Sequence, residues 1–518
     1  MEEFKAIPKE KFAFAAKSDI MHDKKLETKP VGYFRDAFNR FCKNKGAVVA
    51  AVIIIFLLLF AIIAPFCTPY TVEYNDEKFG PALPKNNLFA NTSFWDGCQN
   101  KSVGKVGFIY DYAIGQETGH NVVKNQEYTI NEEGLYCYRW DTYKKEGFGK
   151  YKMISNEEYA DIQRYQDETG RQVIYPTLRL SDRPKMVNAE DDANYYYKTR
   201  TLQGTTVPDL DEDGNVQPVY WTYKAGTFND MYTSRMRIEG EDGIDIDGEK
   251  YYYAYARIMS NNVEVRAHYY EYYIYKHTQV LKDGITEPCF LFGTTREGKD
   301  IFTCLASGAR FSFLFGISVA LVNMLVGAIY GSIEGYYGGK TDLIMERISD
   351  ILSAVPMMII ITLLKLHMGG SSHALILFLA FFLTGWISMA GRTRMQFYRY
   401  KNQEYVLAAR TLGASDKRLM FKHIFPNAIG TLVTSCALVI PSMIYSETNL
   451  TYLGIINLES GSITSVGTLI SAGQSCLSTY PHVALFPSLF LALLMLSFNL
   501  LGNGLRDAFN PSLRGSEG

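Results

Sequence analysis

Residues Glu404–Asn427 read EYVLAARTLGASDKRLMFKHIFPN, a charged and alanine-rich segment between two long apolar runs. The first residues are good helix formers, Gly413 interrupts them, and the helical pattern resumes from Lys417 to His423, ahead of Pro426. The sequence therefore predicts a helix, a turn and a second helix.

We interpret this segment as a docking element. Its small side chains would let another backbone approach closely, and its charged side chains would border that contact. An amphipathic loop lying on the membrane surface is the alternative interpretation. The residues assigned to the contact are Glu404, Ala408, Ala409, Arg410, Gly413, Asp416 and Lys417.

Apolar stretches around this segment predict an α-helical membrane protein with six transmembrane helices. The average composition, with 47% hydrophobic residues and a net charge of −2, would fit a soluble protein. Ala47–Pro65, however, contains no charged side chain and is long enough, at about 1.5 Å per residue, to cross a hydrocarbon core of about 30 Å. The other five are Phe311–Tyr330, Ile351–Leu366, Ala374–Ala390, Ile429–Tyr445 and Val483–Leu501.

The distribution of positive charge predicts the orientation. Arg392–Lys422 contains eight Lys and Arg residues against two acidic ones, whereas Glu447–Pro481 contains no Lys or Arg. Because positive loops stay in the cytoplasm, the docking segment and, with six spans, both termini are expected there. Val31–Lys43 is expected to form an interfacial elbow helix with Phe34, Phe38 and Phe41 on its apolar side.

The same topology places a large inserted domain outside the cell, between the first two spans. From Thr68 to Asp300 there are 37 acidic and 27 basic residues, and 27 of the 37 tyrosines. This composition predicts a soluble β-rich or α+β domain. The segment Lys250–His277 suits antiparallel strands with a turn at residues 260–262, and Asn156–Asp167 suits a short helix.

The predicted organisation divides the chain into five parts. They are a cytoplasmic segment at 1–45, the first span at 46–66, the inserted domain at 67–300, the remaining spans at 301–505 with the docking loop at 400–427, and a cytoplasmic tail at 506–518.

Two acidic segments of the inserted domain, 209–214 and 242–247, are predicted to be hairpin turns and not metal sites. A calcium-binding loop that began at Asp209 would need a Glu at its twelfth position, where Tyr220 stands. The cysteines of this domain leave two alternatives open, namely one disulfide such as Cys98–Cys137, or free thiols.

Gly293–Asp300, GTTREGKD, departs from the phosphate-loop pattern GxxxxGK[ST] only at Asp300. The hydroxyl at that position would bind Mg²⁺, whereas a carboxylate would neutralise the neighbouring lysine and repel a nucleotide. We therefore expect a structural turn here, no catalytic residues, and no cofactor in this chain.

The docking segment resembles the cytoplasmic EAA loop of ABC importer permeases. Ala408, Ala409, Gly413 and Pro426 match that pattern in register, and its Glu is replaced by Leu407. Glu404, one helical turn earlier, could substitute for that carboxylate. The family's Ile and Leu are replaced by His423 and Phe425.

A second resemblance, more specific, is to the oligopeptide and dipeptide importer permeases. The stretch FLFGTTREGKDIFTCLASGARFSFLFG is similar to the family signature that precedes the second span. SETNLTYLG at Ser446–Gly454 and FNLLGNGLRDAFNPSLR at Phe498–Arg514 match further family segments. Together these resemblances cover Lys43–Thr68 and Cys289–Arg514, and most of the inserted domain has no counterpart in them.

The resemblance implies a type I ABC importer permease of the OppC or DppC kind in the cell membrane. Its implied partners are a second permease subunit of the OppB or DppB kind, two cytoplasmic ATP-binding subunits that hold ATP and Mg²⁺, an extracellular substrate-binding lipoprotein and membrane lipids, with no nucleic acid. The implied substrates are oligopeptides or dipeptides, and importers of other solutes such as metal chelates share the signatures. A membrane-anchored sensor or adhesin and a passive channel are the rival functions.

Polar side chains within the spans are candidates for the translocation path. For each of them, hydrogen bonding within or between helices is the structural alternative. The candidates are Asn323, Thr362, Thr384, Ser388, Ser435 and Asn499.

Overall fold

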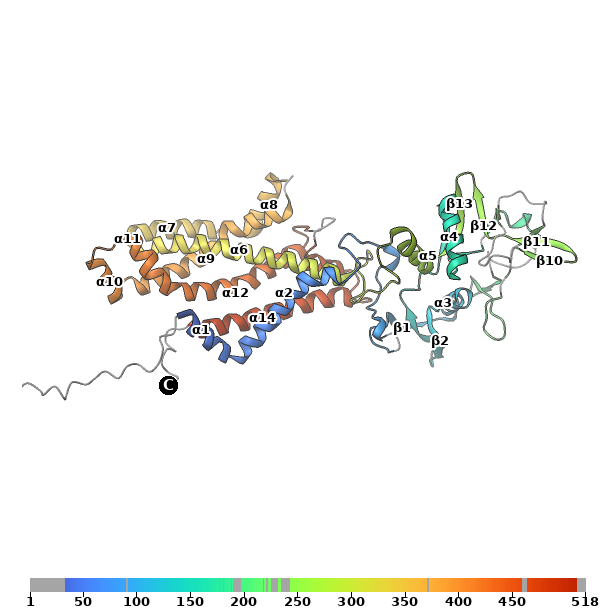
Figure 1. The fold of residues 1–518 in the computed structure, drawn as a ribbon, viewed down its shortest axis with the longest axis horizontal. Helices are drawn as coiled ribbons and strands as arrows, with labels where there is room; N and C mark the ends of the chain where they lie inside the picture. The colour runs from blue at the N-terminus through green and yellow to red at the C-terminus, as the bar shows by residue number, and fades with distance from the viewer. Residues whose placement is uncertain are drawn as a thin grey trace, which may run out of the picture.

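The computed structural model describes residues 33–89, 92–176, 178–179, 181–187, 189, 197–217, 219, 222–224, 232–233, 243–369, 372–458 and 464–509. The molecule is elongated, with a bundle of long helices at one end and a mixed α and β region at the other (Figure 1). The predicted tail beyond 509 and the segment 1–32 lie outside the described residues.

Five helices of the described chain are long and apolar enough to span a membrane, which agrees with the predicted helical membrane protein. Each extends beyond the apolar stretch that predicted it, except at the outer end of the first. They are α2 (Lys45–Ile63), α6 (Ile301–Tyr337), α9 (His373–Tyr400), α12 (Phe425–Tyr452) and α14 (His482–Phe509).

The third predicted span is not one straight helix. Its residues belong to α7 (Gly339–Ser353) and α8 (Met357–His367), which meet at an angle of 73°. The break falls next to Pro356, because proline has no N–H and disfavours helical backbone in the residue before it. The bundle therefore holds five continuous spans, or six if this bent pair crosses as one.

Helix α6 packs most closely against α9 along a stripe of glycines. A Cβ atom on Gly327 would lie 2.6 Å from the carbonyl oxygen of Trp386, and one on Gly335 would lie 2.7 Å from that of Arg394. At Gly331, between them, a Cβ would lie 2.9 Å from the Cβ of Thr393. Small residues allow this approach, and such packing replaces the hydrophobic effect as the cause of helix association in lipid.

Helix α1 (Tyr33–Lys43) leads into the first span, as the elbow prediction requires. An ion pair between Asp36 and Arg40, 3.0 Å long, crosses one turn of it. Phe38 is 64% exposed, whereas Phe41 is half-buried near Gly504 of α14.

The region between the first two spans contains four sheets in its described part. Their strand orders are β1-β3-β2, β10-β11-β8, β4-β13-β12-β9 with β5 beside β13, and β6-β7, all antiparallel. The strands are β1 (Cys98–Val103), β2 (Val123–Ile130), β3 (Tyr136–Asp141), β4 (Phe148–Ser155), β5 (Ile174–Tyr175), β6 (Thr199–Leu202), β7 (Thr205–Pro208), β8 (Thr222–Lys224), β9 (Tyr232–Thr233), β10 (Gly243–Ile246), β11 (Glu249–Tyr253), β12 (Ala256–Met259) and β13 (Asn262–His268). The helices are α3 (Lys105–Thr118), α4 (Asn156–Thr169) and α5 (Tyr269–Tyr275).

Helix α4 confirms the predicted short helix, and Ser155 caps it by accepting a hydrogen bond from the backbone N–H of Glu158. The hairpin β12–β13 confirms the predicted turn, since Met259 pairs with Asn262. The strand prediction was wrong beyond His268, where the chain forms α5. Tyr270, Tyr273 and Ile274 are buried at the spacing of three and four that belongs to one helical face, and Glu271 and Tyr275 are buried as well.

The acidic segment 209–214 forms the predicted turn, in which Asp211 Oδ1 accepts hydrogen bonds from the N–H groups of Asp213 and Asn215. The second turn, between β10 and β11, has positive φ at Asp247 (54°) and Gly248 (81°), as a tight hairpin requires. Asp242 and Tyr220 lie outside the described residues.

The cysteine alternatives resolve to free thiols. In the β1–β3 ladder Cys98 pairs with Asp141, whereas Cys137 pairs with Ser102. The two cysteines are therefore four positions apart along the ladder, or roughly 13 Å at 3.3 Å per residue, too far for a disulfide.

Gly293–Asp300 forms a structural turn, as predicted. Its ends pair as an isolated bridge between Thr294 and Asp300, and the N–H of Thr295 donates to the carbonyl of Lys299. Asp300 then caps α6 by accepting a hydrogen bond of 3.0 Å from the N–H of Thr303. Burial raises the pKa of the Asp300 carboxyl to about 6, against the hydrogen bonds from Thr303.

This turn also lies where the region between the spans joins the bundle. We call this junction, made of residues 82–85 and 290–300, the neck. The N–H of Ala82 donates to Thr294 Oγ1 (2.6 Å), and the N–H of Thr294 donates to the carbonyl of Ala82 (3.0 Å). A little further on, the N–H of Lys85 donates to the carbonyl of Phe290 (2.9 Å). The outgoing and returning chains are thus hydrogen-bonded to each other where they join the bundle.

Candidate functional site: the docking loop and the polar residues of the spans

The predicted docking element is built as a helix, a turn and a second helix. Helix α10 (Glu404–Thr411) ends where Gly413 adopts a left-handed φ of 83°, and α11 (Asp416–Arg418) follows. It lies at the end of the bundle opposite the sheets (Figure 1). A Cβ on Gly413 would meet no atom of this chain within 4 Å, so the space beside this glycine is open.

The second helix does not end ahead of Pro426, and that part of the prediction was wrong. A π-helical segment, Leu419–Ile424, joins α11 directly to α12. Pro426 follows the π-helical segment directly, at the second residue of α12. The docking element and the span α12 are therefore one continuous rod from Asp416 to Tyr452.

Helix α10 is fixed to the bundle by a buried apolar cluster. Val406 is fully buried against Tyr336 of α6, Phe397 of α9, and Leu419 and Ile424 of the π-helical segment. Ala409 packs against the edge of the same cluster. Of the predicted contact residues, the six that lie exposed are Glu404, Ala408, Arg410, Gly413, Asp416 and Lys417.

Tyr336 connects two of the predicted contact residues and was missed by sequence reasoning. Its hydroxyl donates to Asp416 Oδ1 at 2.5 Å and lies 3.4 Å from Nη2 of Arg410. The tyrosine belongs to the end of α6, far away in the sequence, so no local pattern could have indicated it.

A charged cluster holds the neighbouring helix ends together. Arg394 of α9 binds both Asp342 (2.6 Å) and Glu346 (2.8 Å) of α7, and lies 3.6 Å from Glu334 of α6. The hydroxyl of Tyr398 donates to Asp342 at 2.7 Å. At this end of the bundle α6, α7 and α9 are therefore coupled by ion pairs as well as by packing.

The candidate path residues differ in how far this chain buries them. Asn323 and Ser435 are buried inside this chain, and Asn323 Nδ2 donates to the carbonyl of Phe381 at 3.4 Å. Thr384 is half-buried. Thr362, Ser388 and Asn499 are exposed, and the Thr362 hydroxyl donates to the carbonyl of Met358 at 2.8 Å in its own helix.

Glu447 is a buried carboxyl group within span α12 that sequence reasoning did not select. The Ser312 hydroxyl of α6 donates to its Oε2 (3.0 Å), and Thr451 Oγ1 lies 3.2 Å from its Oε1. Glu447 lies two positions beyond the predicted span Ile429–Tyr445, between Ser446 and Thr448, so the apolar pattern carried no signal for it.

In the described part of the chain, no group of three or more His, Cys, Asp and Glu side chains is arranged to hold a metal ion. Two cavities lie away from the docking loop. One of about 420 Å³ borders the neck beside Cys67, Tyr70 and Asp300, and one of about 630 Å³ lies against the β1-β3-β2 sheet.

Two family models match the parts of the chain that form the bundle. Residues 311–515 match the inner membrane component of binding-protein-dependent transport systems, and residues 32–84 match the N-terminal transmembrane domain of oligopeptide transport permease C. Residues 85–310 lie between the two matches.

The relatives are bacterial permeases. The oligopeptide transport system permease protein OppC of Bacillus subtilis is 44% identical over 223 residues, which are 43% of this chain and 72% of that protein. The dipeptide transport system permease protein DppC of the same organism is 38% identical over 43% of this chain and 69% of that protein. Among solved structures, a chain of the inward-facing MetNI methionine ABC transporter covers 40% of this chain and 96% of its own length, with 15% identity and a TM-score of 0.32.

Proposed function

Because the chain belongs to the family of oligopeptide and dipeptide transport permeases, we propose that it is one of two permease subunits of an ATP-driven peptide importer. The 44% identity to OppC over most of the length of that protein carries this proposal. The partners are a second permease subunit, two cytoplasmic ATP-binding subunits that hold ATP and Mg²⁺, and an extracellular lipoprotein that delivers the peptide. This chain binds no cofactor and catalyses no reaction.

The orientation follows from the charges of the loops. The docking loop, rich in Lys and Arg, faces the cytoplasm, together with both termini. The region between the first two spans then lies outside the cell, because it occupies the opposite end of the molecule (Figure 1). There it can meet the lipoprotein.

The docking loop couples the ATP-binding subunits to the spans. Movement of α10 reaches α6 and α9 through the cluster around Val406, and reaches α12 through the continuous rod that begins at Asp416. Tyr336 adds a polar connection between Asp416, Arg410 and α6. A packed, ion-paired unit of this kind moves as a rigid body, which is how closure of the ATP-binding subunits would switch access to the path.

The exposed polar residues of the spans are the better candidates for the path in this conformation. Ser388 and Asn499 are exposed in this chain, and a path between two permease subunits would run along such a surface. Asn323 fits a helix-packing role, because it lies against Gly385 of α9. A sensor or adhesin would not need an open, left-handed glycine beside an exposed helix, so we favour the importer over that rival.

Gly413 offers a direct test of docking. Asparagine tolerates a positive φ, so Gly413→Asn should preserve the turn while its side chain fills the open space where the partner would approach. We expect the tagged variant to retain the second permease subunit in a mild-detergent pull-down, to lose the ATP-binding subunits, and to lose uptake of radiolabelled trialanine.

The matched control is Gly204→Asn, in the turn between β6 and β7. Gly204 also has a positive φ (75°) and an equally open surrounding, but it lies far from the docking loop. It should behave as the native chain does. Full recovery of the ATP-binding subunits with Gly413→Asn would refute docking at this loop.

Tyr336→Phe distinguishes the binding of the ATP-binding subunits from the transmission of their movement to the spans. The variant keeps the ring in the apolar cluster but removes the hydroxyl that joins Asp416 to Arg410. We expect the ATP-binding subunits to remain bound and uptake per hydrolysed ATP to fall several-fold. Unchanged coupling would show that the apolar cluster alone transmits the movement.

A further inference from the structure

The chain that precedes β1 carries a group of exposed apolar side chains, which we call the rim loop (residues 86–89 and 92–95). Leu88 is 87% exposed, Phe94 65% and Phe89 38%. None of these side chains belongs to a family segment, since the first family match ends at residue 84. Three large apolar groups at the tip of one short loop in contact with water would be costly, so a covering partner is expected.

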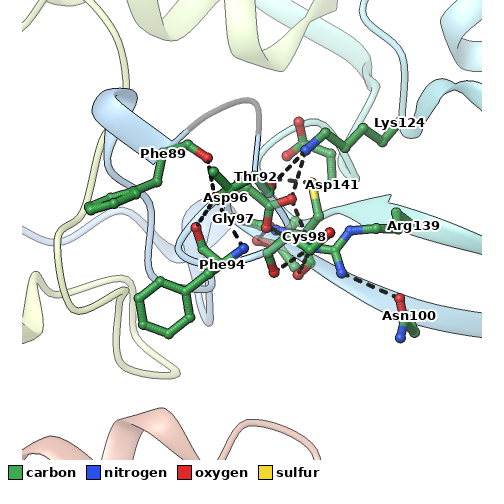
Figure 2. Close-up of polar contacts among 12 residues, drawn as sticks. Phe89, Thr92, Phe94, Asp96, Gly97, Cys98, Asn100, Lys124, Arg139 and Asp141 are labelled. Carbon is green, nitrogen blue, oxygen red and sulfur yellow. Dashed lines mark hydrogen bonds and ion pairs between the residues drawn. The ribbon is translucent and has the colours of Figure 1, made fainter.

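The rim loop is held rigidly at its base. Asp96, which is 7% exposed, binds Arg139 (2.7 Å) and Lys124 (2.8 Å) from the adjoining sheet, and these hydrogen bonds hold the pKa of its carboxyl below the usual value although burial opposes this. The Thr92 hydroxyl lies 2.8 Å from the carbonyls of both Phe89 and Phe94. Figure 2 shows the rings of Phe89 and Phe94 pointing away from this polar cluster.

An unbroken series of aromatic contacts joins the rim loop to the spans. Trp95 stacks against Phe292 and Phe486, at centroid distances of 6.4 and 6.2 Å, and its indole N–H donates to the carbonyl of Leu291. Phe292 contacts Phe302 (5.1 Å), and Phe302 contacts Phe60 (5.3 Å).

These contacts fix the depth of the rim loop relative to the bilayer. Phe60 is in the last turn of α2, Phe302 in the first turn of α6, and Phe486 in the first turns of α14. All three positions mark the ends of membrane-spanning helices on the side of the sheets. Trp95 therefore lies at the boundary of the hydrocarbon core, where tryptophan is typically enriched, and Phe66, 81% exposed just past α2, lies at the same boundary.

We propose that the rim loop is a membrane anchor that inserts Leu88, Phe89 and Phe94 into the lipid headgroup and acyl boundary. Lipid is favoured as the occupant because the apolar patch continues, through Trp95, to the outer ends of the spans, where Ile62 (53%), Phe66 (81%) and Leu485 (57%) are exposed. The anchor would fix the tilt of the region between the spans over the bilayer, and the ion pairs of Asp96 would preset its shape before insertion. This anchoring role is separate from transport and does not depend on which solute is carried.

The test uses the assembled transporter in phosphatidylcholine nanodiscs. A fluorinated phenylalanine is incorporated at position 94, and separately at position 258 of β12. Ile258 is the matched control, because it is 43% exposed and β12 lies at the far end of the region (Figure 1). Fluorine NMR signals are then recorded with a nitroxide attached to lipid headgroups, and with a water-soluble nitroxide.

We expect the lipid-bound nitroxide to erase the signal at position 94 and the soluble one to leave it, with the reverse at position 258. A Leu88→Asp, Phe89→Asp double variant should restore the signal at position 94 in the presence of the nitroxide lipid. Broadening at position 94 by the soluble nitroxide alone would mean exposure to water and would overturn the proposal. Protection from both nitroxides would mean that a protein subunit covers the loop, and would overturn it equally.

Discussion

The glycine stripe between α6 and α9 and the sheet around β13 show two opposite ways of stabilising packed elements. In the bundle, Gly327, Gly331 and Gly335 bring backbones together so closely that no side chain fits. In the sheet region, a buried carboxylate, Glu264, binds Arg179 at 2.7 Å beside a core of tyrosine and aliphatic side chains. The difference reflects the solvent of each region. Lipid offers no hydrophobic gain for helix association, whereas water drives side-chain burial and leaves polar groups that must be paired.

The largest effect is expected from a substitution that places a side chain in the close contact between α6 and α9. Gly331→Val should abolish the folded bundle, because the new side chain would overlap the backbone of Ala390, which cannot move without displacing α9. Size-exclusion chromatography of the detergent-extracted complex should show loss of the monodisperse peak. Gly391→Val is the control, since a Cβ on Gly391 meets nothing within 4 Å. Equal behaviour of the two variants would contradict close packing as the stabilising cause.

A smaller effect is expected from neutralising the buried carboxylate. Glu264→Gln removes a charge that lies 3.4 Å from the Arg257 guanidinium, whose side chain is 14% exposed and which keeps Asp182 at 3.6 Å. Because one buried partner remains, the free energy of unfolding of the sheet region should fall by roughly 2 kcal/mol. Thermal unfolding followed by intrinsic fluorescence would measure it. Asp161→Asn, which removes an exposed ion pair with Arg164, should leave the transition unchanged.

Asp300, in the neck, provides a third test, in which the stability of the native chain and of a variant is compared as the pH changes. The pKa of Asp300, raised by burial to about 6, lies above its ordinary value of about 3.9, so the folded state holds this proton more tightly. The contribution of this carboxyl to stability should therefore decline as the pH rises from about 4 to about 6, by about 3 kcal/mol at most. Asp300→Asn keeps a capping side chain without the titration, so its melting temperature should vary less with pH than that of the native chain. Parallel pH profiles for the two proteins would contradict this assignment.

The sequence predicted the spans well, because an apolar run of sufficient length has few alternatives to a membrane helix. It missed the bend between α7 and α8, because an apolar run does not show whether the helix continues in one direction. Pro356 was a local signal for the bend. It also misassigned α5, where the strand propensity of tyrosine outweighed a helical spacing that was readable at Tyr270, Tyr273 and Ile274.

The docking loop was predicted in its local features and missed in its long-range ones. Gly413 indicated the turn, and the exposed residues of α10 lie where a partner could reach them. The role of Tyr336 depends on tertiary contact and left no local pattern. For the path candidates, the rotation of each helix decides whether a side chain such as Asn323 or Asn499 is buried or exposed, and a composition of polar residues alone does not specify that rotation.

The hydrogen-bonded neck has a consequence for how such a chain could arise. Because Lys85 and Phe290 are already paired, a short linker between them would close the chain without moving either adjoining span. Insertions succeed where both connections lie together at a surface, and this position meets that condition. Residues 86–289 can therefore be regarded as an insertion that could be removed, or exchanged for another domain, without rebuilding the helices of the bundle.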